Sequence, residues 1–190
     1  MLDKLNVNHE IEYKTIINQT LFNQLIASID TVKIEQINSY FDTIDHELLA
    51  LKIIIRIREC NSNFLWTMKV TDNTGVIEYE EPVIGDTLEA FDNTNIKTIL
   101  KYYQIDISKL ILIGHLKTIR YLHKTKDYEL CFDNNYYLSK HDYELEYEVK
   151  SDYLDHFANF ISILNRFNIK YQPSIPKALR LFHYQKATNN

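Results

Sequence analysis

Two segments far apart in the chain alternate charged residues with large apolar ones. They read Glu10-Ile11-Glu12-Tyr13-Lys14 near the start and Tyr143-Glu144-Leu145-Glu146-Tyr147-Glu148-Val149 nearer the end. Successive side chains of an extended strand point to opposite faces, so both segments predict strands with one charged and one apolar face. Up to five carboxylates would then share one face of a sheet, where they repel one another unless a cation lies among them.

The rest of the chain predicts six more strands, with helices between and after them. The strands are expected at residues 34–43, 51–59, 64–70, 76–83, 111–124 and 128–133, the last followed by a turn at Asn134-Asn135. Helical spacing of apolar residues is expected from Thr20 to Ile29, within residues 85–105, from Ser151 or Asp152 to Asn168, and after Pro176. Turn signals between successive strands indicate antiparallel pairing. We therefore predict an α+β protein with residues 1–190 in a single domain.

Composition narrows the classes of function. The chain has only three glycines, which excludes Gly-rich dinucleotide-binding and P-loop motifs, so a phosphate would have to be bound by side chains. The two cysteines form no CxxC motif, which argues against a thiolate zinc site. A formal net charge of -5 argues against general nucleic-acid binding. No apolar stretch is long enough for a signal peptide or a bilayer span, so we expect a cytoplasmic protein with no membrane partner.

The charged residues are segregated by strand. Glutamates lie on the predicted first, fifth and eighth strands, whereas arginines and lysines lie on the third, fourth and sixth. Two arrangements fit such strands: an open sheet that shows its charged face to water, or a closed sheet whose charged face lines a lumen. A solvated face usually mixes the two signs, and an eight-stranded barrel can enclose one small ligand. We therefore favour an eight-stranded antiparallel β-barrel, a tunnel with a charged lumen and helices outside.

Energetics favour a bound partner in such a lumen. An unpaired buried carboxylate costs several kcal/mol, while a whole domain is stable by only about 5–15 kcal/mol. Several carboxylates therefore need counter-ions if they are buried together. A divalent cation combined with a phosphate chain would neutralise both the acidic and the basic side chains.

The order of these residues resembles that of the CYTH proteins, also known as triphosphate tunnel metalloenzymes. Their hallmark is an ExExK strand, matched here by residues 10–14. The similarity continues through Tyr40-Phe41-Asp42-Thr43, Arg56 and Arg58, Thr67 and Lys69, Glu78, Thr118-Ile119-Arg120, Asp133, and Glu144 with Glu146, and it ends at Lys177 and Arg180. Glu148 adds a third acid to the same face of the last strand, and Glu80 has no clear counterpart in the family pattern. The resemblance implies an eight-stranded antiparallel tunnel that binds a small-molecule triphosphate and Mg²⁺ or Mn²⁺.

The implied function is metal-dependent hydrolysis of inorganic tripolyphosphate or of an organic or nucleoside triphosphate. The expected metal ligands are Glu10, Glu12, Glu144 and Glu146, with Glu78, Asp133 and Glu148 in secondary roles. The expected phosphate-binding residues are Lys14, Arg56, Arg58, Lys69, Arg120, Lys177 and Arg180. Arginine offers planar bidentate donors to phosphate oxygens, and carboxylates hold cations that bridge such oxygens. Glu10, Glu12 and Lys14 are the expected catalytic residues, with Lys14 assisting activation of the attacking water.

Other interpretations stay open at this point. The same tunnel could serve an adenylate cyclase of the CYTH type, or a non-catalytic module that binds polyphosphate or a nucleotide. Tyr40 and Asp42 could be ordinary strand-end residues, and Asp133 could only set the predicted turn. Lys177 and Arg180 could form a solvated helix face. The sequence also leaves open the physiological substrate, the oligomeric state, the preferred metal, and which two acids of the last strand bind it.

Overall fold

The computed structural model describes residues 6–73, 75–152 and 155–188. These residues form two compact units. The first unit contains Gln36–Leu116, together with the described residues before Glu10 and after Pro176. The second unit contains Glu10–Glu35 and Lys117–Pro176.

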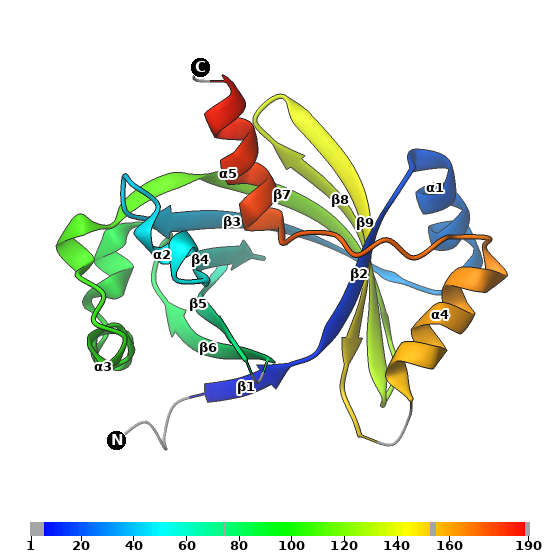
Figure 1. Cartoon of the computed structure of the whole chain (residues 1–190), viewed down its shortest axis with the longest axis horizontal. Coiled ribbons are helices and arrows are strands. Elements are labelled where there is room, and N and C mark those ends of the chain that lie inside the picture. Colours follow the sequence, from blue (N-terminus) through cyan, green and yellow to red (C-terminus); the bar gives the residue numbers. More distant parts are fainter. Residues whose placement is uncertain (1–5, 74, 153–154, 189–190) are drawn as a thin grey trace. The chain divides into compact units, whose positions relative to one another are not determined.

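Nine strands form one sheet, in the order β1-β6-β5-β4-β3-β7-β8-β9-β2 (Figure 1). Their bounds are β1 Asn6–Glu10, β2 Glu12–Ile17, β3 Val32–Asp42, β4 Ile53–Cys60, β5 Asn63–Asp72, β6 Gly75–Val83, β7 Ile111–Lys124, β8 Tyr128–Tyr137 and β9 Lys140–Val149. Strand pairs with an assigned register are antiparallel, which confirms the predicted fold class. The predicted count of eight was wrong because the expected first strand is split at Ile11: β1 neighbours β6, whereas β2 neighbours β9.

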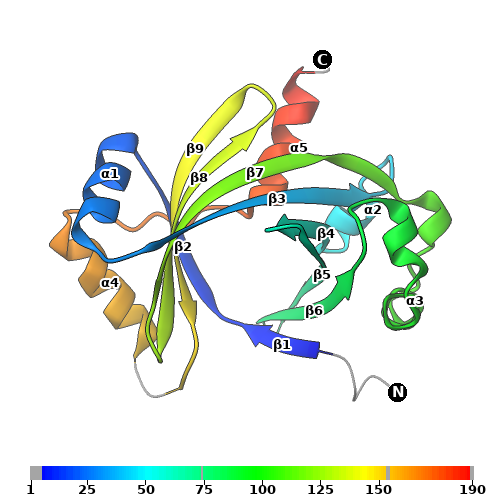
Figure 2. The ribbon, with the colours of Figure 1, turned by 180° about the vertical axis from the view of Figure 1, so that it is seen from behind.

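In the second unit, helices α1 (Gln19–Ser28) and α4 (His156–Arg166) cover the apolar face of β2, β8 and β9 (Figures 1 and 2). Tyr13 of β2 stacks on Phe160 of α4, with ring centroids 5.8 Å apart. Phe22 of α1 meets Tyr143 of β9 at 4.8 Å. Because side chains alternate along a strand, the packing of Tyr13 against α4 turns Lys14 to the opposite, charged face.

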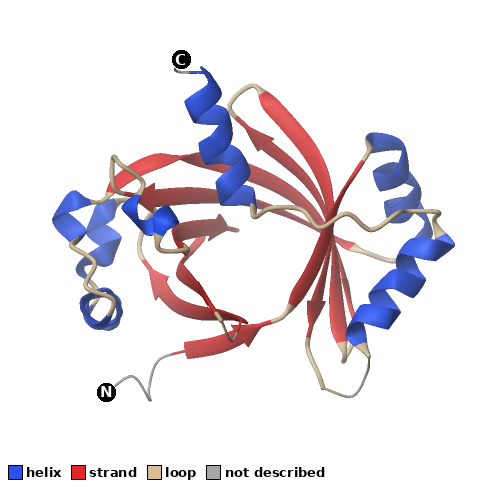
Figure 3. Cartoon of the chain, viewed as in Figure 1, coloured by secondary structure: helices blue, strands red, loops and turns tan. Residues whose placement is uncertain are grey.

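The remaining helical segments are α2 Glu47–Ala50, the 3₁₀ helices η1 Leu88–Asp92 and η2 Ile107–Lys109, α3 Thr94–Tyr102 and α5 Lys177–Thr188 (Figure 3). The helix predicted to start at Ser151 or Asp152 begins instead at His156. It starts there because the Asp155 side chain caps it, accepting a hydrogen bond from the backbone N–H of Ala158 at 3.0 Å. No helix in the described part of the chain is long and apolar enough to cross a membrane.

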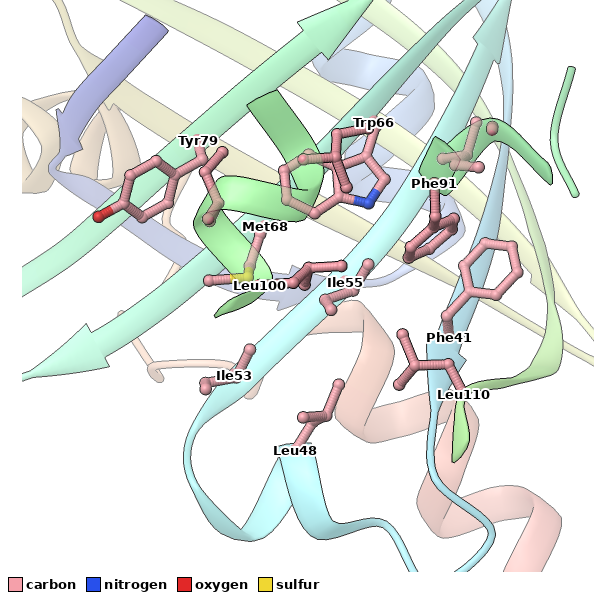
Figure 4. Packing of buried hydrophobic residues seen from close by; sticks show 14 of the residues in the cluster. Phe41, Leu48, Ile53, Ile55, Trp66, Met68, Tyr79, Phe91, Leu100 and Leu110 are labelled. Atoms are coloured by element: carbon pink, nitrogen blue, oxygen red, sulfur yellow. The ribbon is translucent and has the colours of Figure 1, made fainter. Parts of the chain in front are cut away.

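In the first unit, the apolar faces of β3 to β6 pack against α3 and η1 (Figure 4). Trp66 and Met68 of β5 are fully buried there, and Phe91 of η1 meets the Trp66 ring edge-on at 6.2 Å. The alternation of side chains then turns Thr67 and Lys69 to the other face of the sheet. The sequence analysis predicted this division of the β5 side chains between the two faces.

Helix α5 lies on the side of its unit's sheet opposite to α3. Its Phe182 meets Tyr40 of β3 edge-on at 6.2 Å, and Tyr40 lies opposite Arg56 on the charged face. Gln185 of α5 donates a hydrogen bond to a backbone carbonyl of β7 at 2.7 Å. Gly114 permits this approach, because a Cβ at that position would lie 3.1 Å from the Gln185 amide nitrogen. Helix α5 therefore lies on the charged side of its unit's sheet, unlike the helices predicted outside.

Strand β8 continues through the turn predicted at Asn134-Asn135 and ends at Tyr137. Asn135 is fully buried, and its side-chain oxygen accepts a hydrogen bond from the Thr118 hydroxyl at 2.8 Å. Asparagine commonly marks turns, but here a polar neighbour on β7 satisfies its amide inside a strand. Asp133 thus lies within β8, and the interpretation that it only sets a turn was wrong.

Candidate active site

The register of the second unit brings three carboxylates together on the charged face. Asp133 of β8 lies directly opposite Glu144 of β9, and Glu146 follows two residues along the same strand. One carboxylate oxygen from each of the three lies within 4.8 Å of the others. Asp133 and Glu144 are 0% exposed, and Glu146 is 8% exposed. Carboxylates this close and this deeply buried need positive charge among them.

Arg120 of β7 supplies part of that charge. It lies opposite Asp133 and donates two hydrogen bonds to it, from Nε to Oδ1 at 2.8 Å and from Nη2 to Oδ2 at 2.7 Å. The same Nη2 donates to Oε2 of Glu146 at 2.6 Å. Burial alone would lower the pKa of Arg120, but the adjoining Asp133 and Glu146 raise it well above its usual value. Arg120 is therefore a permanent cation that orients two of the three carboxylates.

The buried cluster combines three carboxylates with the guanidinium of Arg120. Carboxylate oxygens are the ligands that hard divalent cations such as Mg²⁺ and Mn²⁺ prefer. In donor type and in spacing, the cluster could hold one divalent cation.

A second row of charges lies on the same face, across β2, β9 and β8. Glu12 lies opposite Glu148, which lies opposite Glu129 on its other side. The Lys14 amine donates a hydrogen bond to Glu12, and Lys150 pairs with both Glu148 and Glu129. The sequence analysis missed Glu129 and Lys150, because their membership in this row depends on the strand register.

Glu10 is the last residue of β1 and precedes the break at Ile11, so it does not belong to the β2–β9 ladder. The other predicted site residues of the second unit lie on its charged face: Glu12, Lys14, Arg120, Asp133, Glu144, Glu146 and Glu148. Glu144 and Glu146 contribute to the buried cluster, whereas Glu148 lies beside Glu12.

In the first unit, cationic side chains surround Glu78. Lys69 of β5 lies opposite Glu78 of β6, with 3.5 Å between Nζ and Oε1, and Nη2 of Arg56 lies 3.7 Å from the same oxygen. Burial would raise the pKa of Glu78, but Lys69, Arg56 and Arg58 outweigh it and lower the pKa below its usual value. Glu78 is thus an ionised partner of these cations, and its secondary role as a metal ligand stays a prediction.

The neighbouring row of this face contains Arg56, Thr67 and Glu80, which lie opposite one another on β4, β5 and β6. Burial and the nearby Glu78 carboxylate raise the pKa of Glu80. The hydroxyl of Thr67, a residue that is 1% exposed, finds no hydrogen-bond partner among the described residues. A phosphate oxygen would supply the acceptor that this buried hydroxyl lacks.

The other predicted phosphate-binding residues of the first unit are Arg58, Lys177 and Arg180. Arg58 of β4 donates through Nε to the Asn38 side chain at 3.2 Å, and the two residues lie opposite each other. Lys177 and Arg180 lie in the first turn of α5 and are both half-buried, whereas a solvated helix face would expose them. The sequence analysis did not identify Asn38, which is 1% exposed, because only its position in an alternating strand marks it.

Asp42 has a structural role. Its carboxylate accepts backbone hydrogen bonds from Thr43 at 2.7 Å, Leu48 at 2.9 Å and Leu49 at 3.2 Å. The last two N–H groups belong to the short helix α2, so Asp42 caps it from the end of β3. Tyr40 packs against α5. The interpretation of Tyr40 and Asp42 as strand-end structural residues therefore fits the structure.

Comparison with known proteins decides the family. The model of the CYTH domain matches residues 8–182. The chain belongs to the CYTH domain family. This confirms the resemblance drawn from the ExExK strand and from the basic and acidic residues that follow it. The CYTH match spans residues of both units.

Three similar proteins match nearly the whole chain. A Bacillus subtilis protein named "Putative triphosphatase YjbK" is 27% identical over 184 residues, which cover 93% of this chain and 96% of that protein. The crystal structure of a putative adenylate cyclase from Bacillus halodurans is 31% identical, with a TM-score of 0.84, and the match covers 94% of this chain and 100% of that one. A Hippeastrum protein, described as a putative adenylyl cyclase with a dominant triphosphatase activity, shares the fold at 18% identity and a TM-score of 0.72, over 93% of this chain and 96% of that one.

Proposed function

We propose that this CYTH protein hydrolyses a small-molecule triphosphate with the help of Mg²⁺ or Mn²⁺. The observation that carries the proposal is the buried cluster of Asp133, Glu144 and Glu146, in which one carboxylate oxygen from each residue lies within 4.8 Å of the others. Such oxygens are the ligands that Mg²⁺ and Mn²⁺ prefer. The Bacillus subtilis relative is named for the same activity. Residues 1–190 are proposed to act as one domain, since the family match spans both units.

The cationic side chains of the first unit are proposed to bind the phosphates. Arg56 and Arg58 present bidentate donors, and Lys69 adds a point charge. Glu78 holds this positive charge in place through its contacts with Arg56 and Lys69. The unpartnered hydroxyl of Thr67 would donate a further hydrogen bond to the bound phosphate. Lys177 and Arg180 are proposed to act in the same way from α5.

The carboxylates of the second unit are proposed to hold the divalent cation. Asp133, Glu144 and Glu146 provide oxygen ligands, and the guanidinium of Arg120 fixes the orientation of two of them. Held by such oxygens, a divalent cation would supply positive charge for phosphoryl transfer.

The ladder between β2 and β9 is proposed to orient the attacking water. The water oxygen bonds to the terminal phosphorus, the bridging oxygen leaves with the remaining diphosphate, and Glu12 accepts the proton released from the water. Lys14, hydrogen-bonded to Glu12, fixes the direction of that carboxylate. Glu10 and Glu148 are proposed to assist from the neighbouring positions.

The test is phosphate release from tripolyphosphate, ATP and thiamine triphosphate, each measured with Mg²⁺, with Mn²⁺ and with EDTA. We expect release that requires a metal, and the ranking of substrates will narrow the substrate class. Absence of release from all three substrates, with tripolyphosphate still bound in calorimetry, would overturn hydrolysis and favour a binding module.

Adenylate cyclase activity is the second candidate, because the Bacillus halodurans relative is described as a putative adenylate cyclase. In that reaction the ribose 3′ oxygen attacks the α-phosphorus and diphosphate leaves. Incubation with ATP and Mn²⁺ followed by chromatography distinguishes the two: cyclic AMP with diphosphate supports the cyclase, whereas ADP with phosphate supports hydrolysis.

A further inference from the structure

Arg120 and Ser174 are among the donors that hold the three carboxylates of the buried cluster. Arg120 orients Asp133 and Glu146. Glu144 receives a hydrogen bond from the Ser174 hydroxyl, with 2.5 Å between Oγ and Oε1. Glu144 is 0% exposed, so bulk water cannot supply that donor. Ser174 lies 30 residues away in the chain, in the segment between α4 and α5.

The backbone around Ser174 is fixed against β2. The Ser174 N–H donates to the carbonyl of Lys14 at 3.2 Å, and Pro173 forms an isolated bridge with Thr15. The hydroxyl of Thr15, a fully buried residue, donates to the Gln172 carbonyl at 3.0 Å. Figure 1 shows this segment, in orange, running past β2. Ser174 thus approaches the cluster from an anchored segment.

We infer that Ser174 is a positioning residue that holds Glu144 in the orientation needed to ligate a divalent cation. The inference rests on the proposed function, because it assigns a role at the same metal-binding cluster. Donors behind ligating carboxylates set their orientation, and their loss typically weakens metal binding about 10–100-fold. A hydroxyl is suited to this position because it is neutral. A lysine or arginine there would cancel charge that the cluster needs for a divalent cation.

The experiment measures Mn²⁺ binding by calorimetry, without substrate, in wild type and four variants. Ser174→Ala removes the donor, Ser174→Thr keeps a hydroxyl, and Glu144→Gln removes a ligand charge. Ser151→Ala is the matched control, because the Ser151 hydroxyl also donates to a carboxylate, that of Asp127 at 2.9 Å, outside the cluster. Circular dichroism confirms that each variant is folded.

We expect Ser174→Ala to weaken Mn²⁺ binding by about 10-fold or more, Ser174→Thr to restore most of it, and Ser151→Ala to match wild type. The metal concentration for half-maximal phosphate release should rise in parallel, with the turnover at saturating metal largely retained. Wild-type affinity in Ser174→Ala would overturn the role of Ser174 while leaving the proposed function in place. If wild type and Glu144→Gln both fail to bind Mn²⁺, the metal site of the proposed function is refuted, and the role of Ser174 with it.

Discussion

Replacing Arg120 with methionine tests whether the cluster is an electrostatic unit. Methionine keeps much of the side-chain volume but removes the three charge-assisted hydrogen bonds, at 2.8, 2.7 and 2.6 Å, to Asp133 and Glu146. The substitution also removes one positive charge from the cluster. Removing one partner of a buried ion pair typically costs about 3–5 kcal/mol. We expect Arg120→Met to lower the free energy of unfolding by about that amount in the absence of divalent metal.

For a chain of this length, 1 kcal/mol shifts the melting temperature by about 2–4 °C, so the melting temperature should fall by about 6–20 °C. Urea unfolding followed by far-UV circular dichroism measures the loss across the whole chain. The fluorescence of Trp66, the only tryptophan, reports on the first unit, so comparing the two signals shows whether the loss is confined to the second unit.

Two comparisons make this prediction decisive. Arg166→Met, at an exposed position in the last turn of α4, removes an arginine outside the cluster and should change stability by less than about 0.5 kcal/mol. A ligand that binds only the folded state adds about 2.7 kcal/mol at one hundred times its dissociation constant. Saturating Mg²⁺ should therefore stabilise Arg120→Met, because a bound cation replaces part of the lost positive charge. If Arg120→Met unfolds within about 1 kcal/mol of wild type without metal, the electrostatic argument is refuted.

Three further predictions follow from single side chains. Because the pKa of Glu78 is depressed in the folded state, its ionised carboxylate stabilises the fold above the unfolded-state pKa, and this contribution is lost as pH falls through the lower folded-state pKa. Glu78→Gln should therefore make the stability less dependent on pH in the acid range. Urea unfolding measured below about pH 5 tests this. Arg58→Ala should abolish phosphate release from tripolyphosphate while the melting curve stays close to that of wild type, and substantial turnover in that variant would contradict the proposed role. Asp42→Ala should lower the free energy of unfolding by about 1–2 kcal/mol through loss of the α2 cap, without changing the affinity for Mn²⁺.

Much of the fold could be predicted because alternation in a strand is a local signal. The strand at 111–124 has the predicted limits, and the face shared by Thr67 and Lys69 is the predicted one. Large apolar residues such as Trp66 and Met68 determine which face of the strand is buried. Their neighbours in the sequence then lie on the other face, because side chains alternate. The same reasoning identified most of the residues that the structure gathers on the charged faces.

The errors arose where tertiary contacts override local preference. Asn134 and Asn135 have turn propensity, yet Thr118 satisfies the buried amide of Asn135 within β8. The break at Ile11 follows a change of partner strand, from β6 to β9, which no local pattern records. Ser174 lies in a segment without periodicity, and its contact with Glu144 depends on how that segment is anchored.

The three acids of β9 show why a period of two cannot identify metal ligands by itself. Sliding the strand by two residues keeps Glu144, Glu146 and Glu148 on the same face but changes the residue opposite each of them. The observed register places Glu144 opposite Asp133 and Glu148 opposite Glu12. Glu144 and Glu146 therefore join the buried cluster, while Glu148 joins the row beside the proposed water-orienting carboxylate. Alternation predicts which residues can contribute to the site, and the strand register determines which of them act together.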